Sequence, residues 1–151
     1  MSETIFRQCE RSDLKTVGQF VRQLYADDPG EFPVHPEIDL SFAEFERRPE
    51  KGRVVVFEQG SELIGYAILV FFWSNEFGGD IIEIDELLVD RACRGQGIGK
   101  RFFSWLDAEY RGCAGYALQT SEKNEVALRL YKNVGFVASK NHYLIKMRAQ
   151  S

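Results

Sequence analysis

Apolar residues near the beginning of the chain recur at the spacing of an amphipathic helix. Residues 4–8 predict a short strand before it. The buried face of the helix is expected to carry apolar residues three and four positions apart, namely Leu14, Val17, Phe20, Val21 and Leu24. After a loop with three prolines, Ser41 and Glu44 form a capping-box pattern that predicts a second, short helix ending before Pro49.

The middle of the chain changes to the pattern of strands. Residues 53–58 and 62–73 are rich in β-branched and aromatic side chains, and they flank the turn at 59–61. A turn containing two consecutive glycines then precedes another strand from about 81 to 89. These three strands should form an antiparallel meander.

Helical spacing returns at residues 97–110, and a strand follows at 116–120. A strand, a helix and a strand in this order form a βαβ unit, so the strands 81–89 and 116–120 should run parallel. Open α/β sheets bind ligands at the carboxyl ends of such strands. The site is therefore expected around residues 86–99 and 119–131.

The last part of the chain predicts one more helix and one more strand. The helix covers residues 125–133, with Gly135 as its natural C′ residue. Residues 141–148 should close the sheet as its last strand. The whole order of elements predicts a mixed α/β fold in a single domain over 1–151, without a linker or an internal repeat.

Composition and charge narrow the class of protein. The formal net charge is −4 and no basic stripe is present, which argues against binding to nucleic acid. The longest apolar run, 67–73, is far shorter than the roughly 20 residues of a membrane-spanning helix. The three cysteines lack CxxC spacing, and the two histidines lack the spacing of metal ligands. We expect a cytoplasmic protein with reduced thiols, no metal and no membrane contact.

Three glycines at alternate positions separate the strand 81–89 from the following helix. Gly95, Gly97 and Gly99 let main-chain N–H groups approach an anion, and the amino end of a helix adds positive potential. Arg94 and Lys100 add full positive charges. These features fit a pyrophosphate cradle, whereas a tight strand-to-helix turn is the alternative. The spacing matches neither a P-loop nor the GxGxxG dinucleotide fingerprint.

The segment Arg94-Gly95-Gln96-Gly97-Ile98-Gly99 resembles the R/Q-x-x-G-x-G/A signature of the GNAT acetyltransferases. Downstream, Asn124, Tyr131 and the pair Gly135-Phe136 resemble the N-x6-Y…GF segment of the same family. The resemblance implies a twisted mixed sheet of six to seven strands with helices on both faces. It also implies that the parallel strands four and five splay apart. Residues 84–89 are most similar to the diamine and polyamine acetyltransferase branch.

The resemblance implies acetyl-CoA as cosubstrate. The family binds the pantetheine arm in the gap between the splayed strands, as an added strand would bind. On this sequence, main-chain groups of Leu87, Leu88 and Val89 would pair with the arm, and Asn124 and Tyr131 would contact it from the other side. The implied pyrophosphate site consists of Arg94, Gly95, Gln96, Gly97, Ile98, Gly99 and Lys100.

The parity of apolar residues changes within the strand 81–89. Ile82 and Ile84 alternate with acidic residues, whereas Leu87 and Val89 continue on the opposite parity. One extra residue near 85–86 would restore the register, which is the effect of a β-bulge. The alternative is a fully buried strand, in which parity carries no information.

The reaction that the resemblance implies needs a proton acceptor for the amine and a proton donor for the thiolate of CoA. Tyr131 matches the family's general acid, and a phenol with a pKa of about 10 stays protonated at neutral pH. Asp85 and Glu86 are the candidate bases, with Glu86 preferred and Glu83 third. Tyr131 as a core residue and the acids as solvated strand residues are the alternatives.

The acceptor is expected to be a small-molecule or peptide amine. In the family, the acceptor wall comes from the loop between the first two helices and from a strand, here residues 27–32 and 71–73. An acidic and aromatic lining would suit a cation, although a polar loop and core aromatics explain the same residues. A non-catalytic acyl-CoA-binding regulatory module is the alternative function. Many relatives dimerise, which leaves a homodimer open.

Overall fold

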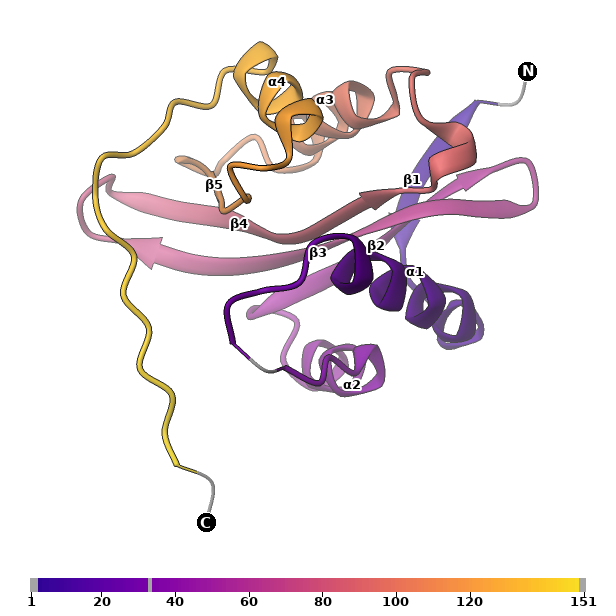
Figure 1. Ribbon diagram of the computed structural model, residues 1–151, viewed down its shortest axis with the longest axis horizontal. Coiled ribbons are helices and arrows are strands. Elements are labelled where there is room, and N and C mark those ends of the chain that lie inside the picture. The colour runs from indigo at the N-terminus through magenta and orange to yellow at the C-terminus, as the bar shows by residue number, and fades with distance from the viewer. Residues whose placement is uncertain (1–2, 33, 150–151) are drawn as a thin grey trace.

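The computed structural model describes residues 3–32 and 34–149, whose strands form one sheet in the order β1-β2-β3-β4-β5 (Figure 1). The strands are β1 Thr4–Gln8, β2 Gly52–Gln59, β3 Glu62–Ser74, β4 Gly79–Val89 and β5 Gly115–Leu118. Neighbouring strands pair antiparallel except β4 and β5, which pair parallel. The predicted meander and the predicted βαβ unit are both confirmed.

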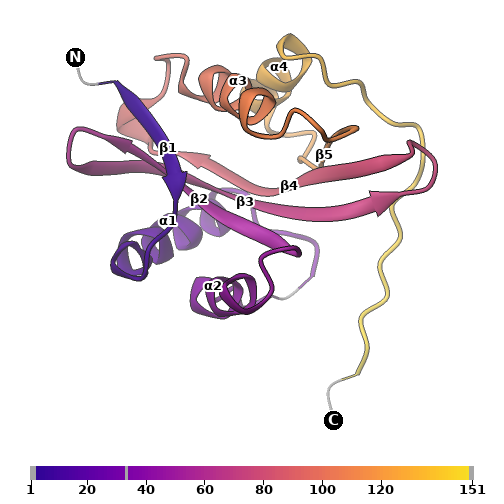
Figure 2. The same cartoon turned by 180° about the vertical axis from the view of Figure 1, so that it is seen from behind.

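Two helices cover each face of the sheet. The helices are α1 Leu14–Asp27, α2 Ile38–Arg47, α3 Ile98–Glu109 and α4 Glu125–Asn133. The pair α1 and α2 lies on one face, and the pair α3 and α4 lies on the other (Figures 1 and 2). Gly135 follows α4 with a φ of 105°, as the predicted C′ position requires.

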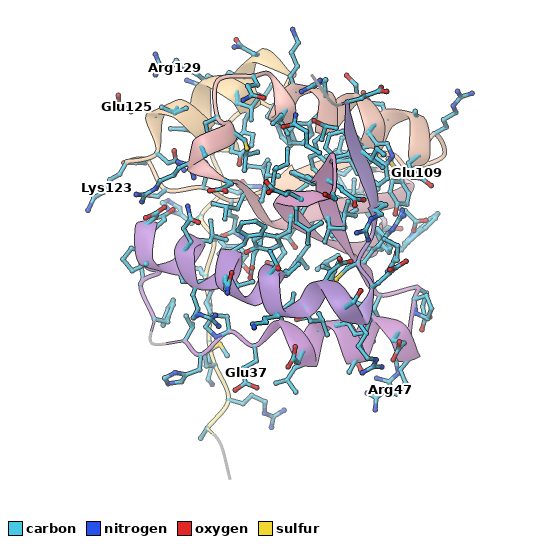
Figure 3. All side chains as sticks on the ribbon, turned by 90° about the vertical axis from the view of Figure 1, so that its right-hand side faces the viewer. Glu37, Arg47, Glu109, Lys123, Glu125 and Arg129 are labelled. Atoms are coloured by element: carbon cyan, nitrogen blue, oxygen red, sulfur yellow. The ribbon has the colours of Figure 1, made fainter. Side chains whose placement is uncertain are left out.

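The two-sided arrangement gives two separate cores, because every inner strand buries both of its faces. The core on the α1 side includes Val17, Phe20, Tyr66, Ile68 and Leu88. The core on the α3 side includes Phe57, Ile82, Ile84, Phe102 and Leu106. In Figure 3 the charged Glu37 and Arg47 of the α2 layer and Lys123, Glu125 and Arg129 of the α4 layer lie at opposite outer surfaces. None of the helices within the described ranges has the length and apolar character to span a bilayer.

The expectation of six to seven strands is wrong for the described residues, since the sheet has five. Residues 141–148, predicted as the closing strand, form neither a helix nor a strand. The chain after α4 instead leaves the body of the molecule (Figures 1 and 2). The alternation of apolar residues gives this segment the potential to be a strand, but a strand also needs a hydrogen-bonding neighbour. We call residues 137–148 the C-terminal segment.

The start of α2 also differs from the expectation. The helix begins at Ile38, so Ser41 lies inside it rather than at its cap. Burial of Ile38 in the α1-side core favours the longer helix. Glu44, the expected partner of Ser41, binds Arg48 and Lys51 at 3.1 and 2.9 Å.

The bulge predicted near 85–86 is confirmed. Ile84 lies opposite Leu69 and Glu86 lies opposite the preceding β3 residue, Ile68, so Asp85 is an extra residue. Side chains before the bulge, such as Ile84, enter the α3-side core at even positions. After the bulge the even position Leu88 enters the α1-side core. The bulge therefore turns Glu86 toward α1.

Candidate functional site

The loop between β4 and α3 has a backbone that favours glycine at two positions. Gly95 and Gly97 have φ values of 81° and 76°, which L-residues rarely adopt. A Cβ atom at either position would meet no atom within 4 Å. The space in front of the backbone is therefore open, and conformation rather than crowding selects glycine.

The amides of this loop are not used by the protein's own backbone. Within residues 3–32 and 34–149, no backbone N–H from Gly95 to Lys100 donates to a backbone carbonyl. The first backbone bond of the helix runs from Arg101 N to Gly97 O at 3.1 Å. Ile98 is buried and anchors the first turn. An anion such as a pyrophosphate fits amides of this kind at the positive end of a helix.

Gly99 has a packing role that the sequence did not indicate. A Cβ atom there would lie 2.7 Å from Cδ2 of Leu130 in α4. Gly99 therefore permits the close approach of α3 and α4.

The charged residues of the loop are exposed, and one of them binds β4. Arg94 Nε donates to the carbonyl oxygen of Val89 at 2.9 Å. That carbonyl, which the family resemblance assigned to the pantetheine arm, is thus already engaged. Gln96 accepts a long hydrogen bond of 3.5 Å from Arg101, and Lys100 extends into solvent.

We predict that Gly97→Ala weakens CoA binding and costs about 1–2 kcal/mol of stability, because alanine is strained in left-handed backbone. Gly112→Ala is the matched control, since it has open space and no positive φ. Calorimetric titration with CoA and urea unfolding measure the two effects. Equal CoA affinity in wild type and Gly97→Ala would remove this loop from the binding site.

The strands β4 and β5 separate beside this loop and leave a cavity. Their pairing ends at Ile84 and Leu118, while β4 continues to Val89. A cavity of about 170 Å³, which we call the β4–β5 cavity, lies there. It is lined by Leu24, Tyr25, Asp28, Ile84, Asp85, Glu86, Leu87, Leu118, Gln119, Thr120, Asn124 and Tyr131.

Most of the residues singled out in the sequence beyond the glycine loop meet in this cavity. Asp85, Glu86 and Leu87 come from β4, Tyr131 comes from α4, and Asn124 is the residue that caps α4. Leu88, by contrast, points its side chain into the α1-side core. These residues meet because the carboxyl ends of two neighbouring parallel strands lie at the same edge of the sheet.

Glu86 is held by two tyrosines that the sequence analysis did not single out. Tyr25 Oη donates to Glu86 Oε2 at 2.8 Å, and Tyr66 Oη donates to Oε1 at 2.7 Å. Burial raises the pKa of Glu86 above its ordinary range, whereas these two hydrogen bonds act in the opposite direction. The only sequence signal was a hydroxylated ring within each of two apolar patterns.

A second cavity, of about 270 Å³, lies between α1, α2 and β3. It is lined by Val21, Tyr25, Val34, His35, Pro36, Glu37, Ile38, Ser41, Ile68 and Glu86. We call it the α1–α2 cavity. Both cavities share Tyr25 and Glu86, so the Glu86 side chain borders the two spaces.

The expected acceptor wall is present only in part. Asp28 lines the β4–β5 cavity. Phe71, Phe72 and Trp73 line neither cavity, because the end of β3 that carries them pairs with the beginning of β4. Phe71 packs on Tyr110, with ring centroids 5.5 Å apart.

The remaining polar residues of the β4–β5 cavity have distinct surroundings. Burial raises the pKa of Tyr131, whose ring makes edge contacts with Phe103 and Phe136. Asp85 is exposed to solvent. Partial desolvation of its carboxyl group by the surrounding protein raises the pKa of Asp85. Asn124 Oδ1 accepts from the Ala127 amide at 3.2 Å and caps α4.

Solved structures share this fold over nearly the whole chain. A possible acetyltransferase from Clostridium difficile 630 superposes with a TM-score of 0.78 at 18% identity, covering 97% of this chain and 99% of its own. A transcriptional regulator from Bacillus halodurans C-125 has a TM-score of 0.76 at 28% identity, with coverages of 97% and 100%. An aminoglycoside N-acetyltransferase, AAC(6')-Iy in complex with CoA, has a TM-score of 0.74 at 18% identity, with coverages of 99% and 97%.

No curated protein matches the chain in sequence. The family model described as Acetyltransferase (GNAT) family matches residues 18–136. This range contains the glycine loop, both cavity walls on β4 and α4, and Tyr131. The chain therefore belongs to the GNAT family and is an acetyl-CoA-dependent N-acetyltransferase.

Proposed function

We propose that this enzyme acetylates a primary amine of a small molecule or peptide, with Glu86 as proton acceptor and Tyr131 as proton donor. The observation that carries the proposal is the position of Glu86, which borders both cavities. The β4–β5 cavity would take the thioester end of acetyl-CoA. The α1–α2 cavity would take the amine, so the two reactants would meet at Glu86.

Acetyl-CoA supplies an activated acetyl group as a thioester. The open amides from Gly95 to Lys100 fit its pyrophosphate. The main chain of Leu87 and Leu88, on the part of β4 that extends beyond β5, is suited to pair with the pantetheine arm.

The acceptor must lose a proton before it can attack, because an alkylammonium has a pKa of about 10.4. The apolar Val21, Ile38 and Ile68 around the α1–α2 cavity would lower that pKa by desolvation. Glu86 would accept the released proton. Glu86 is preferred over Asp85, because Glu86 lines both cavities whereas Asp85 lines only the β4–β5 cavity.

The bond changes balance with these two groups. The amine nitrogen forms a bond to the acetyl carbon, and the C–S bond of the thioester breaks. The departing thiolate takes the phenolic proton of Tyr131, and the second N–H proton of the amine restores the phenol. The products are the acetylated amine and CoA thiol, and one proton remains on Glu86 for release to solvent.

The lining of the α1–α2 cavity indicates the kind of amine that fits. Apolar side chains from α1, α2 and β3 suit a hydrocarbon stem, while Glu86 and Glu37 suit cationic groups. A diamine would place one ammonium near each carboxylate, in line with the resemblance of residues 84–89 to the diamine and polyamine branch.

An acceptor screen tests the proposed function. Acetyl-CoA is incubated with diamines, polyamines, aminoglycosides, amino acids and peptides, and the release of free thiol is measured. Release with a primary amine supports the proposal. Thermal stabilisation by CoA, about 2.7 kcal/mol at a hundredfold the Kd, without thiol release for any amine would instead indicate a binding module.

We predict that Tyr131→Phe lowers kcat about 10²–10⁴-fold with little change in CoA affinity, since a general acid contributes that much. Phenylalanine keeps the ring contacts with Phe103 and Phe136. Steady-state kinetics measure the effect. Tyr110→Phe is the control, because its hydroxyl binds Arg53 at 3.0 Å, away from both cavities. An unchanged kcat in Tyr131→Phe would exclude this role.

A further inference from the structure

The bulge in β4 brings Glu86 onto the same face of the sheet as Tyr66. Tyr66 of β3 lies opposite Leu88, two residues beyond Glu86, and both Tyr66 and Leu88 belong to the α1-side core. Diagonal neighbours on paired strands are within reach of an aromatic side chain. The Tyr66 hydroxyl therefore donates across the two strands to Glu86 Oε1 at 2.7 Å.

The Tyr66 hydroxyl is confined to this one hydrogen bond. Tyr66 is 0% exposed, and its ring is stacked parallel to that of Phe20, with centroids 6.4 Å apart. Within residues 3–32 and 34–149, Glu86 Oε1 is the only acceptor that it meets. Turning the O–H away would leave a buried donor without a partner. Burial raises the pKa of Tyr66, so this phenol keeps its proton.

The Tyr25 hydroxyl has more freedom than that of Tyr66. It comes from the last turn of α1 and donates to Glu86 Oε2 at 2.8 Å. Tyr25 is only partly buried and lines both cavities, so its O–H can turn from Glu86 toward either space. A phenol both donates and accepts hydrogen bonds. Burial raises the pKa of Tyr25 as well, so it also keeps its proton.

The two surroundings make the oxygens of Glu86 unequal as proton acceptors. A proton on Oε1 would point at the Tyr66 hydroxyl, whose own proton would then have no acceptor. A proton on Oε2 would point at the Tyr25 hydroxyl, which can accept it by turning its own O–H into a cavity. The neutral carboxyl group would thus keep Oε1 as its carbonyl oxygen and carry its hydrogen on Oε2.

We propose that Tyr25 and Tyr66 are positioning residues with different tasks in the acetyl transfer. Tyr66 holds Oε1 as a permanent acceptor and so directs the proton of the amine to Oε2. Tyr25 donates to the charged carboxylate and accepts from the neutral carboxyl group. The N–H bond of the amine breaks and the Oε2–H bond forms, while each tyrosine retains its proton. The proposal rests on the proposed role of Glu86 as proton acceptor.

The other titratable groups near Glu86 make no hydrogen bond to it in the part of the chain that the structure describes. Asp85 is its neighbour in β4, and the charge of Asp85 adds to the rise in the pKa of Glu86. The rest line the two cavities, namely Asp28, His35, Glu37 and Tyr131. Because the two tyrosines stabilise the ionised carboxylate, loss of either hydroxyl should raise the pKa of Glu86 further.

Infrared difference spectra of the full chain, recorded below and above the pKa of Glu86, test the assignment without any substrate. The C=O band of neutral Glu86 is the one that is absent in Glu86→Gln. A hydrogen bond donated to a carbonyl oxygen weakens the C=O bond. Tyr66→Phe should therefore move this band to higher wavenumber, and Tyr25→Phe should move it less. A larger shift in Tyr25→Phe, or no shift in either variant, would overturn the proposal.

The pH profile of kcat provides a second readout. Its acidic limb should move to higher pH in both tyrosine variants, because each loses a hydrogen bond to ionised Glu86. Poorer orientation of the carboxylate should also lower kcat at high pH by up to about 10²-fold, with little change in KM. Tyr116→Phe is the matched control, since its hydroxyl donates to Asp107 at 2.7 Å, away from both cavities. An unmoved limb in both variants would reject the positioning roles.

These measurements separate the positioning roles from the proposed function. Wild-type kcat in Glu86→Gln would overturn both. A loss of kcat in Glu86→Gln, with the band and the limb unmoved in the tyrosine variants, would overturn the positioning roles alone. Phenylalanine keeps the ring of Tyr66 on Phe20, and urea unfolding checks that the variants fold. If Tyr66→Phe does not fold, Tyr25→Phe decides, because its limb should move while its C=O band stays near the wild-type position.

Discussion

Replacing Glu86 with glutamine is expected to lower kcat/KM about 10²–10⁴-fold, the usual contribution of a general base. Glutamine preserves the volume and an oxygen that accepts from Tyr25 or Tyr66, so the fold and CoA binding should persist. Glu62→Gln at an exposed position of β3 is the control. Asp85→Asn separates the two candidate bases. A larger loss in Asp85→Asn than in Glu86→Gln would move the role of base to Asp85.

The pH dependence of the rate provides a second readout for Glu86. A general base works in its ionised form, so the rate should rise as the pH increases through the pKa of Glu86. Burial raises this pKa, and the acidic limb of the wild-type profile should therefore lie above the ordinary glutamate value of about 4.3. The residual activity of Glu86→Gln should lack this limb. Persistence of the limb in the variant would assign it to another group.

Phe102→Ala is expected to destabilise the protein by about 3–5 kcal/mol, a large share of the roughly 5–15 kcal/mol of a typical domain. Phe102 is 0% exposed, and its ring packs on Phe6, Phe57, Phe103 and Trp105. Truncation leaves a cavity among these four rings, which cannot all move to fill it.

Urea unfolding measures this loss, with Phe77→Ala as the matched control. Phe77 is 65% exposed in the turn before β4, so its removal should change stability by no more than about 0.5 kcal/mol. Similar midpoints for the two variants would contradict the assignment of Phe102 to the centre of the α3-side core.

Local signals explain the parts of the fold that the sequence predicted well. The helix predicted at 125–133 has its apolar periodicity and its terminating glycine within one short stretch of sequence. The structure gives the helix the same bounds. The bulge at Asp85 was visible because a change of parity is a local property. The prediction of a closing strand at 141–148 was wrong, because the alternation of apolar residues describes only that one segment. Whether a segment finds a neighbour depends on the rest of the molecule.

The candidate site also combines features that the sequence predicts with features that it does not. The glycine loop was predicted from the sequence because its chemistry lies within seven consecutive residues. The environment of Glu86 was not, since Tyr25 is 61 residues and Tyr66 is 20 residues away in the chain. Gly99 matched the signature, but its contact with Leu130 depends on how two helices pack.

The bulge at Asp85 determines which face of the sheet each later side chain of β4 points to. If residue 85 paired with β3 in regular register instead of bulging, the side chains of the next residues would turn to the opposite faces of the sheet. The carboxylate of Glu86 would then point among the rings beneath α3, and the Leu87 side chain would occupy its place beside Tyr25. Single-residue insertions should be tolerated in the turns around this strand. Within the strand, deletion of Asp85 alone would keep Glu86 opposite Ile68 and facing α1.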